Sequence, residues 1–190
     1  MSQPPSPAVF LDRDGVINRT VFRDGETRPP ATLADFELLH GVPEALRRLA
    51  DAGFKLVVVT NQPDVARGRQ KGENVEQMND RIRRTLPVLD VLTCYHDNAD
   101  NCACRKPKPG LLLEAARRFN LDLPSSYVIG DRWSDVLAGQ SAGCRAAILI
   151  ATPHSGRERC APDHVAADLG EAAEWILGSL EQRCGTLRPK

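Results

Sequence analysis

The sequence predicts an α/β fold in which one parallel sheet carries helices on both faces. Three observations support this class. Short apolar runs alternate with amphipathic stretches along most of the chain, which is typical of parallel strands joined by helices. The run Lys55–Thr60 (KLVVVT) is almost entirely apolar and does not alternate with polar residues, which indicates a strand buried on both faces. The chain has 190 residues, enough for one domain with a sizeable core.

The order of the elements follows from local signals. The first strand is predicted over Ala8–Leu11, where a compact apolar run ends at an aspartate. A helix is predicted over Pro43–Ala52, because proline suits the first turn of a helix and the glycine that follows suits its end. The other predicted strands are Lys55–Thr60, Val88–Thr93, Tyr127–Gly130, Ala146–Ile150 and Val165–Ala167, and the other predicted helices are Glu73–Leu86, Pro109–Phe119, Ser134–Ala142 and Gly170–Leu180.

A single domain is predicted over residues 8–180, with a disordered lead at 1–7 and a polar tail at 181–190. Lys+Arg and Asp+Glu number 25 each, and this balance counts against a nucleic-acid partner. No apolar run reaches membrane-spanning length, and the start MSQPPSP lacks the features of a secretory signal. We therefore expect a cytoplasmic monomer with neither a nucleic-acid nor a membrane partner.

Two carboxylates, Asp12 and Asp14, follow the first predicted strand directly. At that position they can converge on one metal ion and one phosphate. Asp12 can attack phosphorus as a carboxylate nucleophile, and Asp14 can protonate the leaving oxygen and then activate water. Taken alone, the pentapeptide DRDGV is equally compatible with a polar turn, since Asp and Gly are common turn residues.

Further polar residues stand where other strands end. Thr60-Asn61 offers a hydroxyl and an amide to phosphate oxygens, and Arg105-Lys106 places positive charge before a helix. Asp131 and Asp135 follow the strand Tyr127–Gly130 and add carboxylates that suit a hard cation. Because sheets of this class bind ligands beyond the carboxyl ends of their strands, these groups are expected to meet at one site.

Four ordered motifs, DRDGV, VVVTN, RKPKPG and GDRWSD, resemble those of the haloacid dehalogenase superfamily. The resemblance runs from Ala8 to Ile150 and implies a Rossmann-like sheet with a minimal cap or none. It also implies a Mg²⁺-dependent phosphomonoesterase that forms an aspartyl-phosphate on Asp12, with Asp14 as the acid/base.

The same resemblance implies the remaining roles at the site. Mg²⁺ would be held by Asp12, Asp131 and the backbone carbonyl of Asp14, and Asp135 would sit beside it. The phosphoryl group would be bound by Thr60, Asn61 and Gln62. Lys106 would offset the charge of the nucleophile and the phosphate, and Arg105 would contact the substrate.

A cluster of cysteines and a histidine precedes Arg105. Cys94 and His96 are two residues apart, as are Cys102 and Cys104, and in extended chain such pairs point to the same side. Four nitrogen and sulfur ligands with no vacancy describe structural zinc. Ordinary buried thiols are the alternative, but they do not explain four ligands within one polar loop. We predict that Zn²⁺ organises the loop 94–104 and so positions the segment Arg105-Lys106.

Within the superfamily this loop resembles that of the D-glycero-D-manno-heptose 1,7-bisphosphate phosphatases and the related histidinol-phosphate phosphatases. The expected reaction is removal of the C7 phosphate from the heptose bisphosphate. The expected partner is thus a small phosphorylated sugar or a similar metabolite. Histidinol phosphate is the alternative substrate. A zinc-stabilised binding module without catalysis and a nucleic-acid 3′-phosphatase are alternatives of other kinds. Pro63-Asp64 and Trp133 depart from the pattern of the group near the expected phosphate pocket, so they bear on the substrate.

Overall fold

The computed structural model describes residues 4–23, 26–153 and 155–185. A six-stranded parallel sheet forms the centre of the molecule, in the order β5-β4-β1-β6-β7-β8. These strands are β1 (Ala8–Leu11), β4 (Lys55–Asn61), β5 (Asp90–Cys94), β6 (Tyr127–Gly130), β7 (Ala146–Ile150) and β8 (His164–Ala166). The predicted fold class is confirmed.

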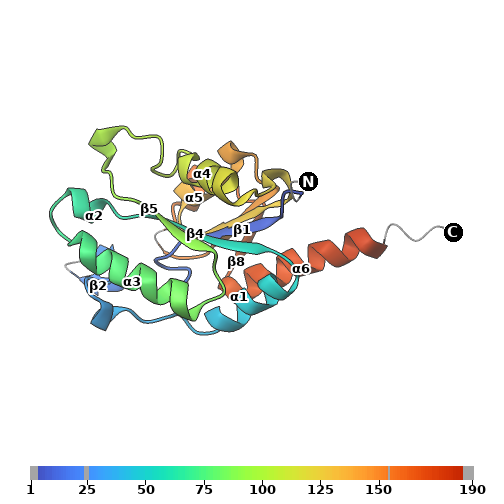
Figure 1. Ribbon diagram of the computed structural model, residues 1–190, viewed down its shortest axis with the longest axis horizontal. Helices are drawn as coiled ribbons and strands as arrows, with labels where there is room; N and C mark the ends of the chain where they lie inside the picture. The colour runs from blue at the N-terminus through green and yellow to red at the C-terminus, as the bar shows by residue number, and fades with distance from the viewer. Residues whose placement is uncertain (1–3, 24–25, 154, 186–190) are drawn as a thin grey trace.

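Helices cover both faces of the sheet (Figure 1). One face carries α1, α3 and α6, and the other carries α4 and α5. The helices are α1 (Val42–Asp51), the short α2 (Pro63–Ala66), α3 (Gly72–Thr85), α4 (Gly110–Phe119), α5 (Trp133–Ala142) and α6 (Leu169–Gly185).

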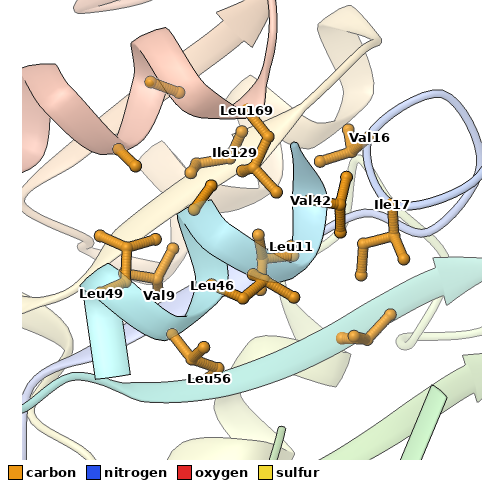
Figure 2. Close-up of a cluster of buried hydrophobic side chains, with 14 of the residues drawn as sticks. Val9, Leu11, Val16, Ile17, Val42, Leu46, Leu49, Leu56, Ile129 and Leu169 are labelled. Atoms are coloured by element: carbon orange, nitrogen blue, oxygen red, sulfur yellow. The ribbon is translucent and has the colours of Figure 1, made fainter. Parts of the chain in front are cut away.

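The strands have buried side chains on both faces because each residue of β1 points into one of two apolar layers. Val9 and Leu11 pack against Leu46 and Leu49 of α1 (Figure 2), whereas Phe10 faces the layer formed with α4 and α5. Burying one such side chain contributes about 1.5–3 kcal/mol. This is why β1 and β4 read as unbroken apolar runs.

Several boundaries differ from those predicted. The strand predicted over Val88–Thr93 is β5, Asp90–Cys94, so it ends with the first cysteine of the cluster. Helix α6 continues five residues past the predicted Leu180, into the expected tail. The lead predicted to be disordered is tied down in part, since Ser6 and Pro7 make backbone hydrogen bonds to Asn120, Asp122 and Lys55. The rest of the predicted lead and tail, residues 1–3 and 186–190, lies outside the described residues.

The segment between β1 and α1 contains an antiparallel pair of strands that was not predicted. It consists of β2 (Val21–Arg23) and β3 (Glu26–Arg28). The Asp24-Gly25 dipeptide between two short runs is a hairpin signal in the sequence. Together with one 3-10 turn at Leu33–Asp35, this pair is too small for a separate cap domain. Among the described helices, none has both the length and the apolar character needed to span a bilayer.

Candidate active site

Lys106 is a buried cation at the carboxyl ends of the strands. Its side chain is 2% exposed, and its Nζ lies 2.6 Å from Asp12 Oδ1 and 2.5 Å from Asp135 Oδ1. The same Nζ donates to the carbonyl of Val59 at 2.7 Å, at the end of β4. Burial acts to lower the pKa of Lys106, but the two carboxylates outweigh it and raise this pKa above its ordinary value. The ammonium group therefore stays charged.

Three buried carboxylates converge next to this ammonium group. Oxygens of Asp12, Asp131 and Asp135 all lie within 4.8 Å of one another. Burial raises the pKa of Asp12 to about 6, although Lys106 acts in the opposite direction. Burial and the charges of Asp12 and Asp135 raise the pKa of Asp131 to about 8. One lysine cannot balance three carboxylates, so the cluster suits a further hard cation with oxygen ligands.

Two further observations fit such a cation. Asp131 Oδ1 is buried and has no hydrogen-bond partner among the described residues, and a buried orphan oxygen is costly unless something binds it. Gly15 permits the close approach of the two loops, since its φ is +88° and a Cβ there would lie 2.5 Å from Asp131 Oδ2. A side chain at Gly130 would likewise collide with Asp135.

The carboxylate of Asp14 is held by three side-chain donors. Gln62 Nε2 donates to its Oδ2 at 2.6 Å, and Asn18 Nδ2 donates to its Oδ1 at 2.9 Å. Arg13, which is wholly buried, donates from Nη2 to the same Oδ2 at 3.0 Å. Asp14 still lines the cavity described below, so it is fixed in direction and open to a ligand.

The predicted phosphate-binding residues are brought together, but their amides have protein partners. Asn61 Nδ2 donates to the carbonyl of Lys106 at 3.1 Å, and Lys106 N donates to Asn61 Oδ1 at 3.2 Å. This reciprocal pair fastens the lysine segment to the end of β4. Gln62 also donates to Thr60 Oγ1 at 2.9 Å, so it links Thr60 to Asp14.

The cysteine cluster lies at the end of β5. Ligand atoms of Cys94, His96, Cys102 and Cys104 lie within 4.8 Å of one another, with Cys94 Sγ 3.1 Å from Cys104 Sγ and His96 Nδ1 3.3 Å from Cys104 Sγ. The three cysteines are free thiols. Burial raises the pKa of Cys94 to about 12, so a thiolate there needs a compensating cation. These donors fit a closed four-coordinate zinc site.

A cavity of about 740 Å³ opens over Asp12, Asp14 and Lys106. Its walls carry many basic side chains, most of which the sequence reasoning missed. They come from segments far apart in the chain: Arg28, Arg67, Arg69, Arg105, Arg132 and Arg159. Outside the reaction centre the acidic lining residue is Asp64, and it is paired with Arg67 at 3.4 Å. A chain with no net charge therefore concentrates positive charge around one cavity.

The two departures noted in the sequence both line this cavity. Asp64 anchors one wall, because its backbone carbonyl accepts from Arg69 N at 2.8 Å and its side chain pairs with Arg67. The guanidinium of Arg159 lies over the ring of Trp133, 3.7 Å from the ring centroid. Arg105 donates from Nε to Asn98 Oδ1 at 2.8 Å and from Nη1 to the carbonyl of His96 at 3.3 Å, so its position depends on the loop 94–104 that carries the cysteine cluster.

Taken together, the doubly covered parallel sheet and its buried lysine–carboxylate centre define an α/β enzyme suited to anionic substrates. A family model described as HAD-hydrolase-like matches residues 103–172. The D-glycero-beta-D-manno-heptose-1,7-bisphosphate 7-phosphatase of Helicobacter pylori (strain J99) is 36% identical over 180 residues, which cover 89% of this chain and 96% of the relative. The enzyme of the same name from Escherichia coli (strain K12) is 34% identical over 186 residues, covering 92% and 90% of the two chains.

Solved structures agree. The D,D-heptose 1,7-bisphosphate phosphatase of B. bronchiseptica, complexed with magnesium and phosphate, has a TM-score of 0.75 and 32% identity, and the match covers 91% of this chain and 99% of that one. The corresponding phosphatase of Burkholderia thailandensis has a TM-score of 0.63 and 28% identity, covering 90% and 98%. The chain therefore belongs to the haloacid dehalogenase superfamily, in its heptose-bisphosphate phosphatase family, and it is a phosphatase.

Proposed function

We propose that this phosphatase removes the C7 phosphate of D-glycero-D-manno-heptose 1,7-bisphosphate through an aspartyl-phosphate on Asp12. The names of the relatives point to this substrate. The observation that carries the proposal is the placement of Lys106 between Asp12 and Asp135 at the base of a cavity with basic walls. One phosphate can react at the base while the walls bind the other.

The first half of the reaction follows from this geometry. Asp12 attacks phosphorus with the oxygen that Lys106 does not hold, and the sugar hydroxyl leaves. Asp14 gives its proton to the leaving oxygen, as a general acid must. Lys106 stabilises the added negative charge as a fixed point charge, which is how phosphoryl transfer is mainly catalysed.

In the second half, Asp14 accepts a proton from water as the water attacks phosphorus, and Asp12 is released. Asp12, Asp131 and the backbone carbonyl of Asp14 would hold Mg²⁺, with Asp135 next to them. Mg²⁺ supplies the positive charge that lets a carboxylate approach a phosphate dianion. Thr60 stands beside this centre at the end of β4 and would bind the phosphoryl oxygens.

Zn²⁺ bound by Cys94, His96, Cys102 and Cys104 would have a scaffolding role. The loop runs directly into Arg105 and Lys106, and Arg105 is bonded to Asn98 and His96 within it. Fixing the loop therefore fixes both cations. Arg105 would meet the distal phosphate, where a guanidinium can make a forked contact. The substrate and its products would be small metabolites, which fit a cavity of about 740 Å³.

The decisive experiment compares substrates on one enzyme preparation. We expect kcat/KM for the heptose 1,7-bisphosphate to exceed that for histidinol phosphate, because histidinol phosphate has one phosphate and a cationic amine that the basic walls repel. Both anomers of the bisphosphate should be tested. A higher kcat/KM for histidinol phosphate would replace the proposed substrate.

The chemistry is tested separately with Asp12→Asn and p-nitrophenyl phosphate. The variant keeps the size of the side chain but removes the nucleophile, so phosphate release should fall at least ~10³-fold while circular dichroism is unchanged. A wild-type protein without phosphatase activity on any of these substrates would favour a zinc-stabilised binding module instead.

A further inference from the structure

Arg13 lies between the two aspartates in sequence but points away from the cavity. It is 0% exposed, and its Nε and Nη2 both donate to the carboxylate of Asp14, at 3.4 Å and 3.0 Å. Its third nitrogen, Nη1, donates to Asn79 Oδ1 at 3.0 Å. Every nitrogen of this buried guanidinium therefore has a partner, and among the described residues the side chains of Asp14 and Asn79 supply them.

Asn79 holds its oxygen towards Arg13 for a clear reason. Its Nδ2 donates to Thr93 Oγ1 at 3.1 Å and to Glu76 Oε1 at 3.2 Å. A guanidinium offers donors alone, so turning the amide over would set donor against donor on one side. Asn79 is itself wholly buried in the middle of α3, and its amide has one favourable orientation.

The consequence reaches Asp14. Without Asn79 the guanidinium would keep one nitrogen unpaired in the interior and would turn to find a partner. Its fork on the Asp14 carboxylate would turn with it. A carboxylate that transfers protons must lie within hydrogen-bond reach of the reacting oxygen, and small displacements of such groups cost large factors in rate.

We propose that Asn79 is a positioning residue for phosphoryl transfer, acting through Arg13 on the orientation of Asp14. This inference rests on the acid/base role of Asp14 in the proposed function. No motif marks Asn79 in the sequence, and it touches neither the cavity nor the carboxylate cluster. Its effect is therefore predicted on proton transfer by Asp14 and not on the binding of substrate.

The test uses Asn79→Leu, which keeps the volume of the side chain and removes both polar groups. With p-nitrophenyl phosphate the leaving anion needs no proton, so phosphorylation of Asp12 proceeds without Asp14. Hydrolysis of the aspartyl-phosphate still needs Asp14 as a base. We expect a rapid release of p-nitrophenolate close to one equivalent per active site, followed by turnover about tenfold slower than wild type. KM should fall in the same proportion as kcat, so that kcat/KM, which depends on binding and on phosphorylation of Asp12, stays within about twofold of wild type.

Two further variants make the result interpretable. Asn79→Asp keeps the acceptor for Arg13; its second oxygen can accept from the Thr93 hydroxyl, and the half-exposed Glu76 can move away from it. This variant should recover turnover to within about threefold of wild type. Arg84→Ala, an exposed position on the same helix, should change neither phase and controls for disturbance of α3. If Asn79→Leu does not fold, Asn79→Asp and Asn79→Ser are compared instead, and Ser should show the slow second phase.

Two results would overturn the proposal. One is turnover by folded Asn79→Leu within twofold of wild type. The other is a loss of turnover in which the rapid phase shrinks in the same proportion, because that indicates inactive protein and not a displaced Asp14. Asp14→Asn in the same assay distinguishes the acid/base role of Asp14 from the positioning role of Asn79. If Asp14→Asn keeps normal turnover, the proposed acid/base role itself fails.

Discussion

Replacing Lys106 with methionine should abolish turnover without abolishing metal binding. Methionine is similar in length and carries no charge. The ammonium group of Lys106 contacts Asp12 at 2.6 Å and Asp135 at 2.5 Å in the interior. For unit charges about 4 Å apart, an effective dielectric constant of about 20 gives roughly 4 kcal/mol per pair. If one such contact is lost at the transition state, the rate falls by about 10³-fold.

The effect on Mg²⁺ should have the opposite sign. Without Lys106, the carboxylates of Asp12, Asp131 and Asp135 have lost the cation that partly neutralises them. A divalent ion then compensates more charge, so its affinity at pH 8 should be equal to or greater than that of the wild type. The Asp12–Lys106 contact is thus expected to matter for chemistry and not for holding the metal.

The assay combines phosphate release at saturating Mg²⁺ with calorimetric titration of Mg²⁺ into metal-free protein. Circular dichroism confirms that the variant is folded. Lys106→Arg is the matched control, since it keeps the charge but its planar group does not fit the narrow space between two carboxylates and a carbonyl. Turnover by Lys106→Met above a tenth of wild type would refute the reasoning, and so would a weaker affinity for Mg²⁺.

Three further predictions concern the metals and the substrate. Because the pKa of Asp131 is raised from 3.8 to about 8, the metal-free folded protein holds a proton that the unfolded chain lacks between these values. The stability of the metal-free protein should fall as pH rises through this window. Mg²⁺ binding at pH 6–7 should release about one proton, and the affinity for Mg²⁺ should rise up to about tenfold per pH unit. Titration in buffers of different ionisation enthalpy measures the proton release, and an affinity that does not depend on pH would contradict the prediction. Replacing Cys102 and Cys104 with Ser should remove bound zinc, lower Tm and reduce kcat, whereas finding a disulfide and no zinc in the wild type by elemental analysis and mass spectrometry would refute the site. Arg105→Ala should lower kcat/KM for the heptose bisphosphate by about tenfold or more and leave p-nitrophenyl phosphate nearly unaffected; an equal loss on both would show that Arg105 does not bind the distal phosphate.

The sheet could be predicted from the sequence because its strands are buried on both faces. Ala8–Leu11, Tyr127–Gly130 and Ala146–Ile150 read as unbroken apolar runs, and all three strands begin and end where predicted. Asp12 and Asp131 were predictable for a related reason, since each directly follows such a run, whereas Lys106 was predicted from the motif RKPKPG before a helix. The β2–β3 pair was missed because its strands have three residues each, too few for a periodic pattern.

The contacts that support the site were not predictable in the same way. Arg13 and Asn79 lie far apart in sequence and join inside the protein, where neither apolar periodicity nor a strand end marks them. Asn61 and Gln62 were expected from the resemblance to bind phosphate, and the sequence does not reveal that their amides also bond Lys106 and Asp14. The basic walls of the cavity could not be predicted because arginines from separate segments converge only after folding, while the net charge of the chain is zero.

The order of the strands has a consequence for how the protein is made. β1 is synthesised before the other five strands of this sheet, yet its neighbours are β4 and the much later β6. The cysteine cluster can assemble once residues 94–104 have been synthesised next to β4. The carboxylate cluster must wait for Asp131 and Asp135, which arrive with β6 and α5. Pairings between such distant segments form slowly. During refolding, zinc should therefore be captured before magnesium, and the return of magnesium binding would time the moment at which β6 joins β1.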